Sequence, residues 1–230
     1  MTATPLQNHD LDRLVADLQQ RSAAQVPAIT GYFADRADRG VATDLADLDT
    51  AADEFLSDKL VALEHDKALL CHRLCLAMRA RRVVEVGTSY GVSTLYLAQA
   101  VRLVVEADGG TGVVVGTEHE PAKAAAARDH FIAAGLDSYI DLREGDVRVS
   151  LRDLDTPVDL VLIDIWPGVA RPALEVVVPK LRRGGVVLID NTENRPEIYR
   201  DVFDYIDDPA NGLVTQTLPF RGGLEMVVKG

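Results

Sequence analysis

Hydrophobic and polar positions divide the chain into a helical N-terminal region and a longer region of alternating strands and helices. Apolar residues recur three and four positions apart over 8–24, and Pro27 and Gly31 then interrupt the pattern. A second helical pattern covers 55–78 and breaks near its middle. No strand pattern occurs before residue 82. We therefore expect residues 1–60 to form a helical appendage, either a lid or a contact between subunits.

From residue 82 onward, short β-branched runs alternate with helical patterns. We expect five strands, three intervening helices, a last helix and a terminal β-hairpin, with the strands at 83–86, 113–117, 140–142, 158–165 and 186–189, the helices at 92–105, 121–134, 172–181 and 196–207, and the hairpin strands at 213–218 and 224–228. Repeated βα units imply a parallel sheet with helices on both faces. Residues 61–230 are therefore expected to form one α/β domain.

The first of these strands ends in a glycine turn. Val83–Val86 leads into Gly87-Thr-Ser-Tyr-Gly91, and an apolar helix follows. This order presents backbone N–H groups at a helix N-terminus to an anionic ligand. Glycine allows the backbone to approach a ligand closely or to take positive φ. The spacing Glu-x-Gly-x-x-x-Gly differs from the Gly-x-Gly-x-x-Gly of dinucleotide binders, which disfavours an NAD-dependent oxidoreductase. A turn that only packs helix against strand is the alternative.

Composition narrows the partners and the compartment. Hydrophobic residues make up 47% of 230 positions, enough for a substantial core, and the net charge of −12 argues against DNA or RNA as a partner. The start of the chain lacks a secretory signal pattern, and no stretch approaches the roughly 20 apolar residues of a membrane span. We expect a cytoplasmic protein that acts on a small molecule. Cys71 and Cys75 have no second Cys or His pair to complete a zinc set, so we expect them to pack as small apolar residues.

Acidic residues stand at the carboxyl ends of the predicted strands, where ligands bind in such sheets. They are Glu85, Glu118, Asp146, Asp164 and Asp190. Glu118 is placed to accept hydrogen bonds from both ribose hydroxyls of an adenosine ligand; capping the next helix is its alternative role. Asp146 stands where an acid meets an adenine amino group, although a helix N-cap looks the same in sequence.

Asp164, Asp190 and Asn191 form a possible metal site, because hard oxygen donors suit magnesium, calcium or manganese. Such an ion binds two neighbouring hydroxyls and lowers their pKa, which produces a nucleophile able to attack a methyl sulfonium. The alternative is that Asp164 contacts only the cofactor while Asp190 and Asn191 cap a loop.

From about residue 60 to its end, the chain resembles the cation-dependent O-methyltransferases, the group that contains catechol and caffeoyl-CoA O-methyltransferases. The matching segments are RRVVEVGTSYGVSTLYLA, the acid Glu118, the EGD turn, VDLVLID, RRGGVVLIDN and LPFRGGLEMVVKG. The resemblance implies a Rossmann-like class I methyltransferase fold, with a seven-stranded, mostly parallel sheet that ends in an antiparallel hairpin. It also implies S-adenosylmethionine (SAM) as methyl donor and often a homodimer.

The resemblance assigns roles to individual positions. It implies that Gly87 and Ser93 hold the methionine part of SAM, that Glu118 holds the ribose and that Asp146 meets the adenine edge. It implies a metal at Asp164, Asp190 and Asn191, which makes Asp164 the candidate catalytic residue for positioning metal and acceptor. The full set of candidate cofactor-binding residues is Glu85, Gly87, Thr88, Ser89, Ser93, Glu118, His119, Asp146 and Asp164.

One departure from the family pattern concerns the general base. Many members carry a lysine three residues after the first metal aspartate, and here Pro167 stands at that position. The base is therefore unknown. Either the metal alone acidifies the hydroxyl, or one of His65, Lys67 and His119 assists, or the acceptor is of a different kind. Trp166, beside this proline, either walls the acceptor site or packs in the core.

We predict a SAM-dependent O-methyltransferase that acts on a small aromatic, catechol-like hydroxyl with help from a divalent metal. One alternative is a metal-independent small-molecule methyltransferase that keeps the Asp-Asn pair for structure. Another is a SAM-binding protein without catalysis, which the missing lysine suggests. The sequence does not name the acceptor.

Overall fold

The structure is a computed structural model that describes residues 4–41, 49–193 and 197–230. Its helices are α1 (His9–Asp38), α2 (Thr50–Leu56), α3 (His65–Met78), α4 (Val92–Asp108), α5 (Pro121–Ala134), α6 (Val147–Ser150), α7 (Pro167–Val177) and α8 (Arg200–Ile206). Its strands are β1 (Arg82–Val86), β2 (Val113–Glu118), β3 (Ile140–Glu144), β4 (Val158–Ile163), β5 (Leu181–Asp190), β6 (Leu213–Leu218) and β7 (Leu224–Lys229).

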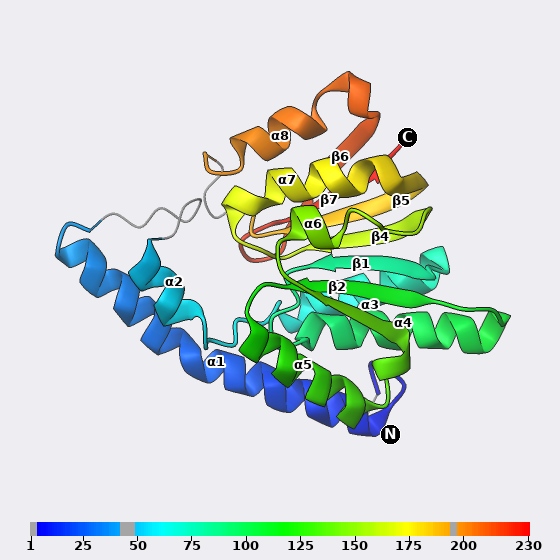
Figure 1. Cartoon of the computed structure of the whole chain (residues 1–230), viewed down its shortest axis with the longest axis horizontal. Helices are drawn as coiled ribbons and strands as arrows, with labels where there is room; N and C mark the ends of the chain where they lie inside the picture. Colours follow the sequence, from blue (N-terminus) through cyan, green and yellow to red (C-terminus); the bar gives the residue numbers. More distant parts are fainter. Residues whose placement is uncertain (1–3, 42–48, 194–196) are drawn as a thin grey trace.

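The seven strands form one sheet in the order β3-β2-β1-β4-β5-β7-β6. The first five are parallel, whereas β7 runs antiparallel to both β5 and β6 (Figure 1). This confirms the predicted Rossmann-like sheet with its C-terminal antiparallel hairpin. The strand order reverses between β1 and β4, and in such sheets the ligand crevice lies beyond the carboxyl ends of the two strands at that point.

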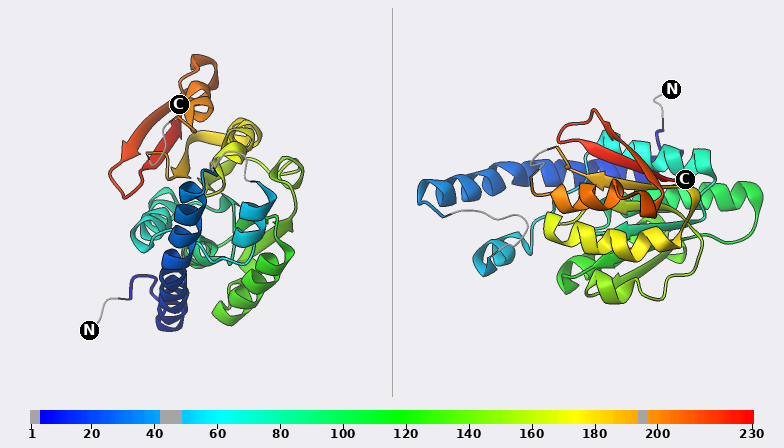
Figure 2. Two further views of the ribbon diagram at one scale, coloured as in Figure 1. Left: turned by 90° about the vertical axis from the view of Figure 1, so that its left-hand side faces the viewer. Right: turned by 90° about the horizontal axis from the view of Figure 1, so that it is seen from above.

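Helices cover both faces of the sheet (Figures 1 and 2). Successive side chains of β1 point to opposite faces of the sheet. Val83 packs into the core on the side of α3, α4 and α5, whereas Val84 and Val86 pack into the core on the side of α7 and α8. Every residue from Val92 to Val101 in α4 is buried, because α1 and α3 pack on the side that does not face the sheet. Helix α4 therefore begins on a fixed base directly after the glycine turn.

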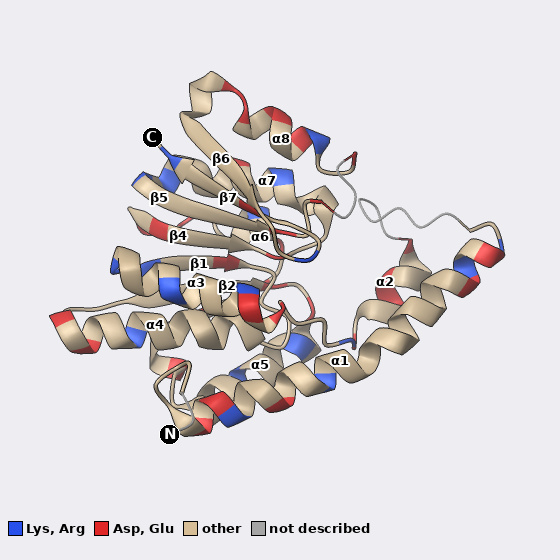
Figure 3. Cartoon of the chain, turned by 180° about the vertical axis from the view of Figure 1, so that it is seen from behind, with Lys and Arg blue, Asp and Glu red and all other residues tan. Residues whose placement is uncertain are grey.

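The first helix is longer than predicted. Helix α1 continues through Pro27 and Gly31 to residue 38, so the expected end near residue 24 is wrong. The proline costs the helix one backbone donor, but it lies in the exposed outer half, where acidic and basic positions intersperse (Figure 3). That half is held by α2, since the ring of Tyr32 stacks on Phe55 with centroids 3.8 Å apart.

The helical pattern over 55–78 corresponds to the end of α2 and to α3, and the non-helical residues between them are 57–64. The backbone of this connection bonds to side chains of α1 instead of to its own turns. The N–H of Leu60 donates to Oε1 of Gln25 at 2.9 Å, and the N–H of Ala62 donates to Oγ of Ser22 at 3.0 Å. The break predicted at residues 65–67 corresponds to the start of α3.

Two other predicted boundaries are wrong, and a third lies outside the described residues. Helix α7 begins at Pro167, where proline suits the first turn, and it contains Pro172, which the sequence analysis took as its start. Strand β5 begins at Leu181 and includes the Gly184-Gly185 pair as an irregularity in its pairing with β4. Helix α8 begins at residue 200; the predicted start at 196 lies outside the described residues.

A buried histidine in α3 gives the fold a predictable pH dependence. His72 is 1% exposed, its Nδ1 lies 3.0 Å from the backbone oxygen of Tyr96, and burial lowers its pKa. The unfolded chain gains a proton there near pH 6.5, whereas the folded chain gains it only at a lower pH. The free energy of unfolding should therefore fall with acidification below about pH 6.5, by up to about 1.4 kcal/mol per pH unit from this group. Urea unfolding at pH 7.5 and 5.5 should show a larger loss for the wild type than for His72→Gln; equal losses would contradict the assignment.

Candidate active site

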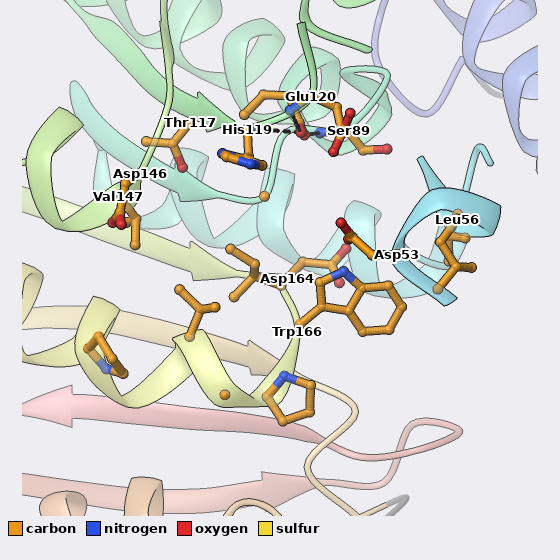
Figure 4. A pocket seen from close by; sticks show the side chains of 18 of the residues that line it. Asp53, Leu56, Ser89, Thr117, His119, Glu120, Asp146, Val147, Asp164 and Trp166 are labelled. Carbon is orange, nitrogen blue, oxygen red and sulfur yellow. Dashed lines mark hydrogen bonds between the residues drawn. The ribbon is translucent and has the colours of Figure 1, made fainter. Parts of the chain in front are cut away.

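A pocket of about 640 Å³ opens at the carboxyl ends of the parallel strands. Its walls come from the glycine turn after β1, the ends of β2 and β4, the turn after β3 and the short helix α2 (Figure 4). Of the candidate cofactor residues, the pocket is lined by Gly87, Ser89, Glu118, His119, Asp146 and Asp164. Thr88 and Ser93 line a small adjoining pocket of about 10 Å³, and Glu85 lines neither.

The glycine turn rests on a buried carboxylate. Glu85 is fully buried, and its Oε2 accepts the hydroxyls of Thr88, at 3.0 Å, and Thr94. Burial raises the pKa of Glu85, while hydroxyls that include Ser93 act to lower it. Its Oε1 has no hydrogen-bond partner in the part of the chain that the structure describes. Glu85 thus anchors the glycine turn from below, and one of its two oxygens keeps an unused acceptor position.

Gly87 cannot carry a side chain in this turn. Its φ is +95°, and a Cβ would lie 2.0 Å from the backbone oxygen of Asp164. Gly87→Ala should therefore push the β1 turn away from the β4 end, and we expect a loss of at least about 2 kcal/mol of stability together with most SAM binding. Gly40→Ala, also at positive φ but with nothing within 4 Å of the added Cβ, is the control. Urea unfolding and calorimetric SAM titration measure the two effects. A fully stable Gly87→Ala protein that binds SAM normally would show that the close approach does not matter.

Glu118 ends β2, and backbone donors hold both of its carboxylate oxygens. Oε2 accepts the N–H of Ser89 at 2.6 Å, and Oε1 accepts the N–H groups of His119 at 2.8 Å and Glu120 at 2.7 Å. Glu118 therefore links the glycine turn to the end of β2. A carboxylate has about four acceptor positions, so capacity remains for a ligand hydroxyl in the pocket. The alternative from sequence, capping of the next helix, is also compatible with these contacts, because His119 and Glu120 directly precede α5, although Glu118 is only 9% exposed.

Asp146 caps α6 and also lines the pocket. Its carboxylate accepts the backbone N–H of Arg148 at 2.8 Å and pairs with the guanidinium of the same residue, which lowers the pKa of Asp146 to about 2. Both interpretations of Asp146 from sequence are thus compatible with its position.

Asp164, Asp190 and Asn191 meet at one corner of the pocket region. Asp164 and Asn191 line the pocket, whereas Asp190 lies behind it and is 5% exposed. Oδ2 of Asp190 accepts Nδ2 of Asn191 at 2.7 Å. Burial and the charge of Asp190 raise the pKa of Asp164 well above its usual value, and burial also raises the pKa of Asp190. Among the described residues, the Asp164 carboxylate has no hydrogen-bond donor.

The donor set at this corner fits a divalent cation. Two carboxylates and an amide offer the hard oxygens that magnesium-type ions take, and a positive charge would relieve the repulsion that raises the pKa of Asp164. Within residues 4–41, 49–193 and 197–230, no cluster of three or more His, Cys, Asp or Glu residues could hold a metal ion. The corner therefore depends on the Asn191 amide as its third donor.

Lys67 contacts this corner from α3. Its Nζ lies 2.6 Å from Oδ1 of Asp190 and 2.9 Å from Oε2 of Glu64, and the residue is 1% exposed. Although burial alone would lower it, the bonds to the two carboxylates raise the pKa of Lys67. The ammonium is thus protonated at neutral pH, which excludes Lys67 as the general base that the sequence analysis considered.

Of the remaining residues that the sequence analysis considered near the acceptor, some line the pocket and one does not. His65 is exposed, lies outside the pocket lining and contacts the hydroxyl of Tyr96 through Nδ1 at 2.8 Å. His119 lines the pocket. Trp166 is 39% exposed and lines the pocket, so it is a wall residue and not part of the core.

The sequence analysis did not identify several residues that line the pocket. Asp53 and Leu56 come from α2, which Lys123 holds over the pocket by donating to the backbone oxygen of Leu56 at 3.0 Å. Tyr199 also lines the pocket, and its hydroxyl donates to the backbone oxygen of Asp190 at 3.2 Å. Lys123 lies in the first turn of α5, five residues after the acid that ends β2, and this closeness in sequence could have signalled it. The positions of Asp53 and Tyr199 carry no such signal.

Two sequence predictions away from the pocket can also be compared with the structure. Cys71 and Cys75 are free and buried, as expected, and burial raises the pKa of both thiols. None of the helices in the described residues has the length and apolar character needed to cross a membrane.

Comparison with known proteins finds similarity to methyltransferases. Residues 84–192 match the family described as a methyltransferase domain. A catechol O-methyltransferase from Mycobacterium tuberculosis is 34% identical over 122 residues, which is 51% of this chain and 52% of that protein. A second one, from Niastella koreensis, is 28% identical over 54% of this chain and 58% of its own length. The chain thus spans about half the length of the curated relatives it matches.

Solved structures extend the likeness over most of the fold. The cofactor-bound Rv0187 from MTB has 25% identity and a TM-score of 0.66, over 86% of this chain and 95% of that chain. An O-methyltransferase from Bacillus cereus, in complex with SAH, has 23% identity and a TM-score of 0.64, over 79% and 98% of the two chains. The second likeness concerns the fold alone.

Proposed function

We propose that this chain transfers the methyl group of SAM to a hydroxyl of a small, catechol-like aromatic acceptor, aided by a divalent cation. Support comes from the match of residues 84–192 to a methyltransferase domain and from the two catechol O-methyltransferases among the relatives. The observation that carries the proposal is the position of Asp164. This residue ends β4, its backbone oxygen contacts the Gly87 turn, and its carboxylate joins the corner with Asp190. Asp164 therefore belongs both to the proposed cofactor site around the Gly87 turn and to the proposed metal corner, which consists of Asp164, Asp190 and Asn191.

The pocket supports a specific orientation of SAM. When SAM is bound, Glu118 would hold the ribose, and His119 and Asp146 would flank the adenine. The Gly87 turn, with Ser89, Thr88 and Ser93, would hold the methionine part. Support comes from the two pockets that these residues line and from the unsatisfied Oε1 of Glu85 beneath the turn. Asp164 would then lie at the methionine end of the cofactor, because its backbone oxygen lies against Gly87.

The acceptor would occupy the other end of the pocket, between Trp166 and α2. Trp166 offers an aromatic wall, and Leu56 and Val61 add apolar surface. When bound, a divalent cation supplies a Lewis acid that lowers the pKa of two neighbouring hydroxyls. Asp164, Asp190 and Asn191 would hold it. The pocket walls then keep the acceptor oxygen in line with the methyl carbon and sulfur, since transfer gains mainly from positioning.

The transfer itself is a displacement at carbon. The acceptor oxygen forms a bond to the methyl carbon while the carbon–sulfur bond breaks, and the electron pair stays on sulfur to leave S-adenosylhomocysteine. The hydroxyl proton must leave before or during this step. Pro167 cannot accept it, and Lys67 is already protonated. His65 lies outside the pocket lining and His119 is assigned to the adenine, so acidification of the hydroxyl by the cation alone is the route that we propose.

We also propose that residues 1–60 act as a lid. Asp53 and Leu56 line the pocket from α2, so this segment forms part of the acceptor wall. A homodimer contact through the same region, with its exposed Val26, is the other role considered, and light scattering at micromolar concentration decides between one copy and two.

Methyl transfer to a panel of catechols and single phenols tests the proposed function. We expect SAM-dependent products from catechols, stimulation by Mg²⁺ and loss of product with EDTA. SAM should also raise the melting temperature, whereas NAD should not. Product formation that EDTA leaves unchanged would favour the metal-independent methyltransferase, for which the Lys67 ammonium on Asp190 is the supporting observation. A melting temperature that rises with NAD alone, and no product from any acceptor, would refute the proposal.

A further inference from the structure

The Asp190 carboxylate is held in one orientation by two different donors. Oδ1 accepts Nζ of Lys67 at 2.6 Å, and Oδ2 accepts Nδ2 of Asn191 at 2.7 Å. The side chains of Lys67 and Asp190 are 1% and 4% exposed, so water does not compete for this bond. Oδ1 therefore faces α3, and Oδ2 is the oxygen on the side of Asn191.

Lys67 is itself fixed in place. It lies in the first turn of α3, and Glu64, the residue just before that helix, binds the same ammonium at 2.9 Å. Lys67 is not released easily from Asp190, because both side chains are buried and leaving Asp190 unpaired there is costly. The Glu64 side chain is 46% exposed, so its contribution is smaller. The ammonium on Oδ1 also repels any cation that approaches this oxygen, whereas the neutral amide of Asn191 on Oδ2 does not, so Oδ2 is the oxygen open to a cation.

We propose that Lys67 determines which divalent cation the corner accepts, by restricting Asp190 to a single ligand oxygen. The inference rests on the proposed function, which puts a cation at Asp164, Asp190 and Asn191. Calcium takes six to eight oxygens and often binds both oxygens of a carboxylate, whereas magnesium keeps six ligands in a strict octahedron and retains several waters. A corner with one oxygen from Asp190 therefore selects magnesium, or manganese of the same geometry, over calcium.

Competition for bound Mn²⁺ tests this selectivity without any methyl transfer. Free Mn²⁺ gives an electron paramagnetic resonance signal that decreases on binding, and Mg²⁺ or Ca²⁺ restores it by displacement. For the wild-type protein we expect Mg²⁺ to displace Mn²⁺ at a concentration at least about tenfold lower than Ca²⁺. Lys67→Met frees Oδ1 of Asp190, and this ratio should fall at least about fivefold. Loss of the lysine charge strengthens attraction for both ions alike, so the ratio isolates the geometry.

Two matched variants complete the test. Lys67→Gln keeps a donor for Oδ1 without the charge and should retain the preference for Mg²⁺. Arg73→Met removes a positive charge from an exposed position of the same helix and should change nothing. SAM titration verifies that each variant is folded.

The outcomes separate the two proposals. A wild-type protein that leaves Mn²⁺ free would contradict the cation part of the proposed function, and this inference with it. A protein that binds Mn²⁺ but shows the same Mg²⁺-to-Ca²⁺ ratio after Lys67→Met would contradict the role of Lys67 alone. A wild type that binds Ca²⁺ as tightly as Mg²⁺ would do the same, even if Lys67→Met failed to fold.

Discussion

Asp190→Asn is expected to reduce Mg²⁺-stimulated methyl transfer to a catechol by about a thousand-fold and to leave SAM binding nearly intact. The substitution removes one of the two negative charges at the metal corner, and losing one preorganised electrostatic contact typically costs about 10²–10³ in rate. Asp190 does not line the pocket, so the cofactor cradle keeps its contacts. The amide oxygen of asparagine still accepts the Lys67 ammonium, which protects the fold.

Calorimetry of SAM binding and initial rates with and without Mg²⁺ measure the two parts of this expectation. Asp204→Asn, which makes the same change at an exposed position of α8, is the matched control and should be silent. If Asp190→Asn kept its response to Mg²⁺, the cation would have to bind elsewhere.

Glu118→Ala should weaken SAM binding by at least about a hundred-fold and also lower stability. Glu118 accepts three backbone N–H groups, from Ser89, His119 and Glu120, and hydrogen bonds to a charged acceptor contribute about 1.5–3 kcal/mol each. Alanine leaves those donors without their acceptor and frees the glycine turn from the end of β2. The ribose loses its acceptor at the same time.

Comparison with Glu118→Gln separates the two contributions. Glutamine keeps one acceptor oxygen, so it should recover part of the stability in urea unfolding while SAM affinity in calorimetry stays low. Glu120→Gln, a neighbouring acid whose backbone rather than side chain bonds to Glu118, serves as the control. A Glu118→Ala protein with wild-type SAM affinity would remove Glu118 from the proposed cofactor site.

The central sheet could be predicted from sequence because its signals are local. The β-branched runs of β1 and β4, the glycine turn and the closing hairpin each follow from neighbouring residues, and their order implies the topology. The acids at the strand ends followed from the same argument, since parallel strands deliver their carboxyl ends to one edge. Glu118 and Asp164 therefore lie at the pocket as predicted.

The N-terminal region could not be predicted in the same way, because its structure depends on contacts between distant segments. The non-helical backbone before α3 is set by Gln25 and Ser22 of α1, and nothing near residue 60 signals this. Helix α1 passes through Pro27, although proline normally ends a helix, and α2 packs on the outer half beyond it. Lys67 was considered as a base because its partner Asp190, 123 residues away, is invisible in local sequence.

The antiparallel hairpin has a consequence for how the site comes into existence during synthesis. Asp190 pairs with Leu224 of β7, and the N–H of Asn191 donates to the backbone oxygen of Gly223 at 3.2 Å. A nascent chain that has emerged only as far as Asn191, one residue past β5, holds every proposed ligand of the corner but lacks the strand that fixes two of them. Cofactor affinity and metal affinity should therefore arise at different times on the ribosome, with the glycine cradle formed first and the metal corner completed only after β7 has docked.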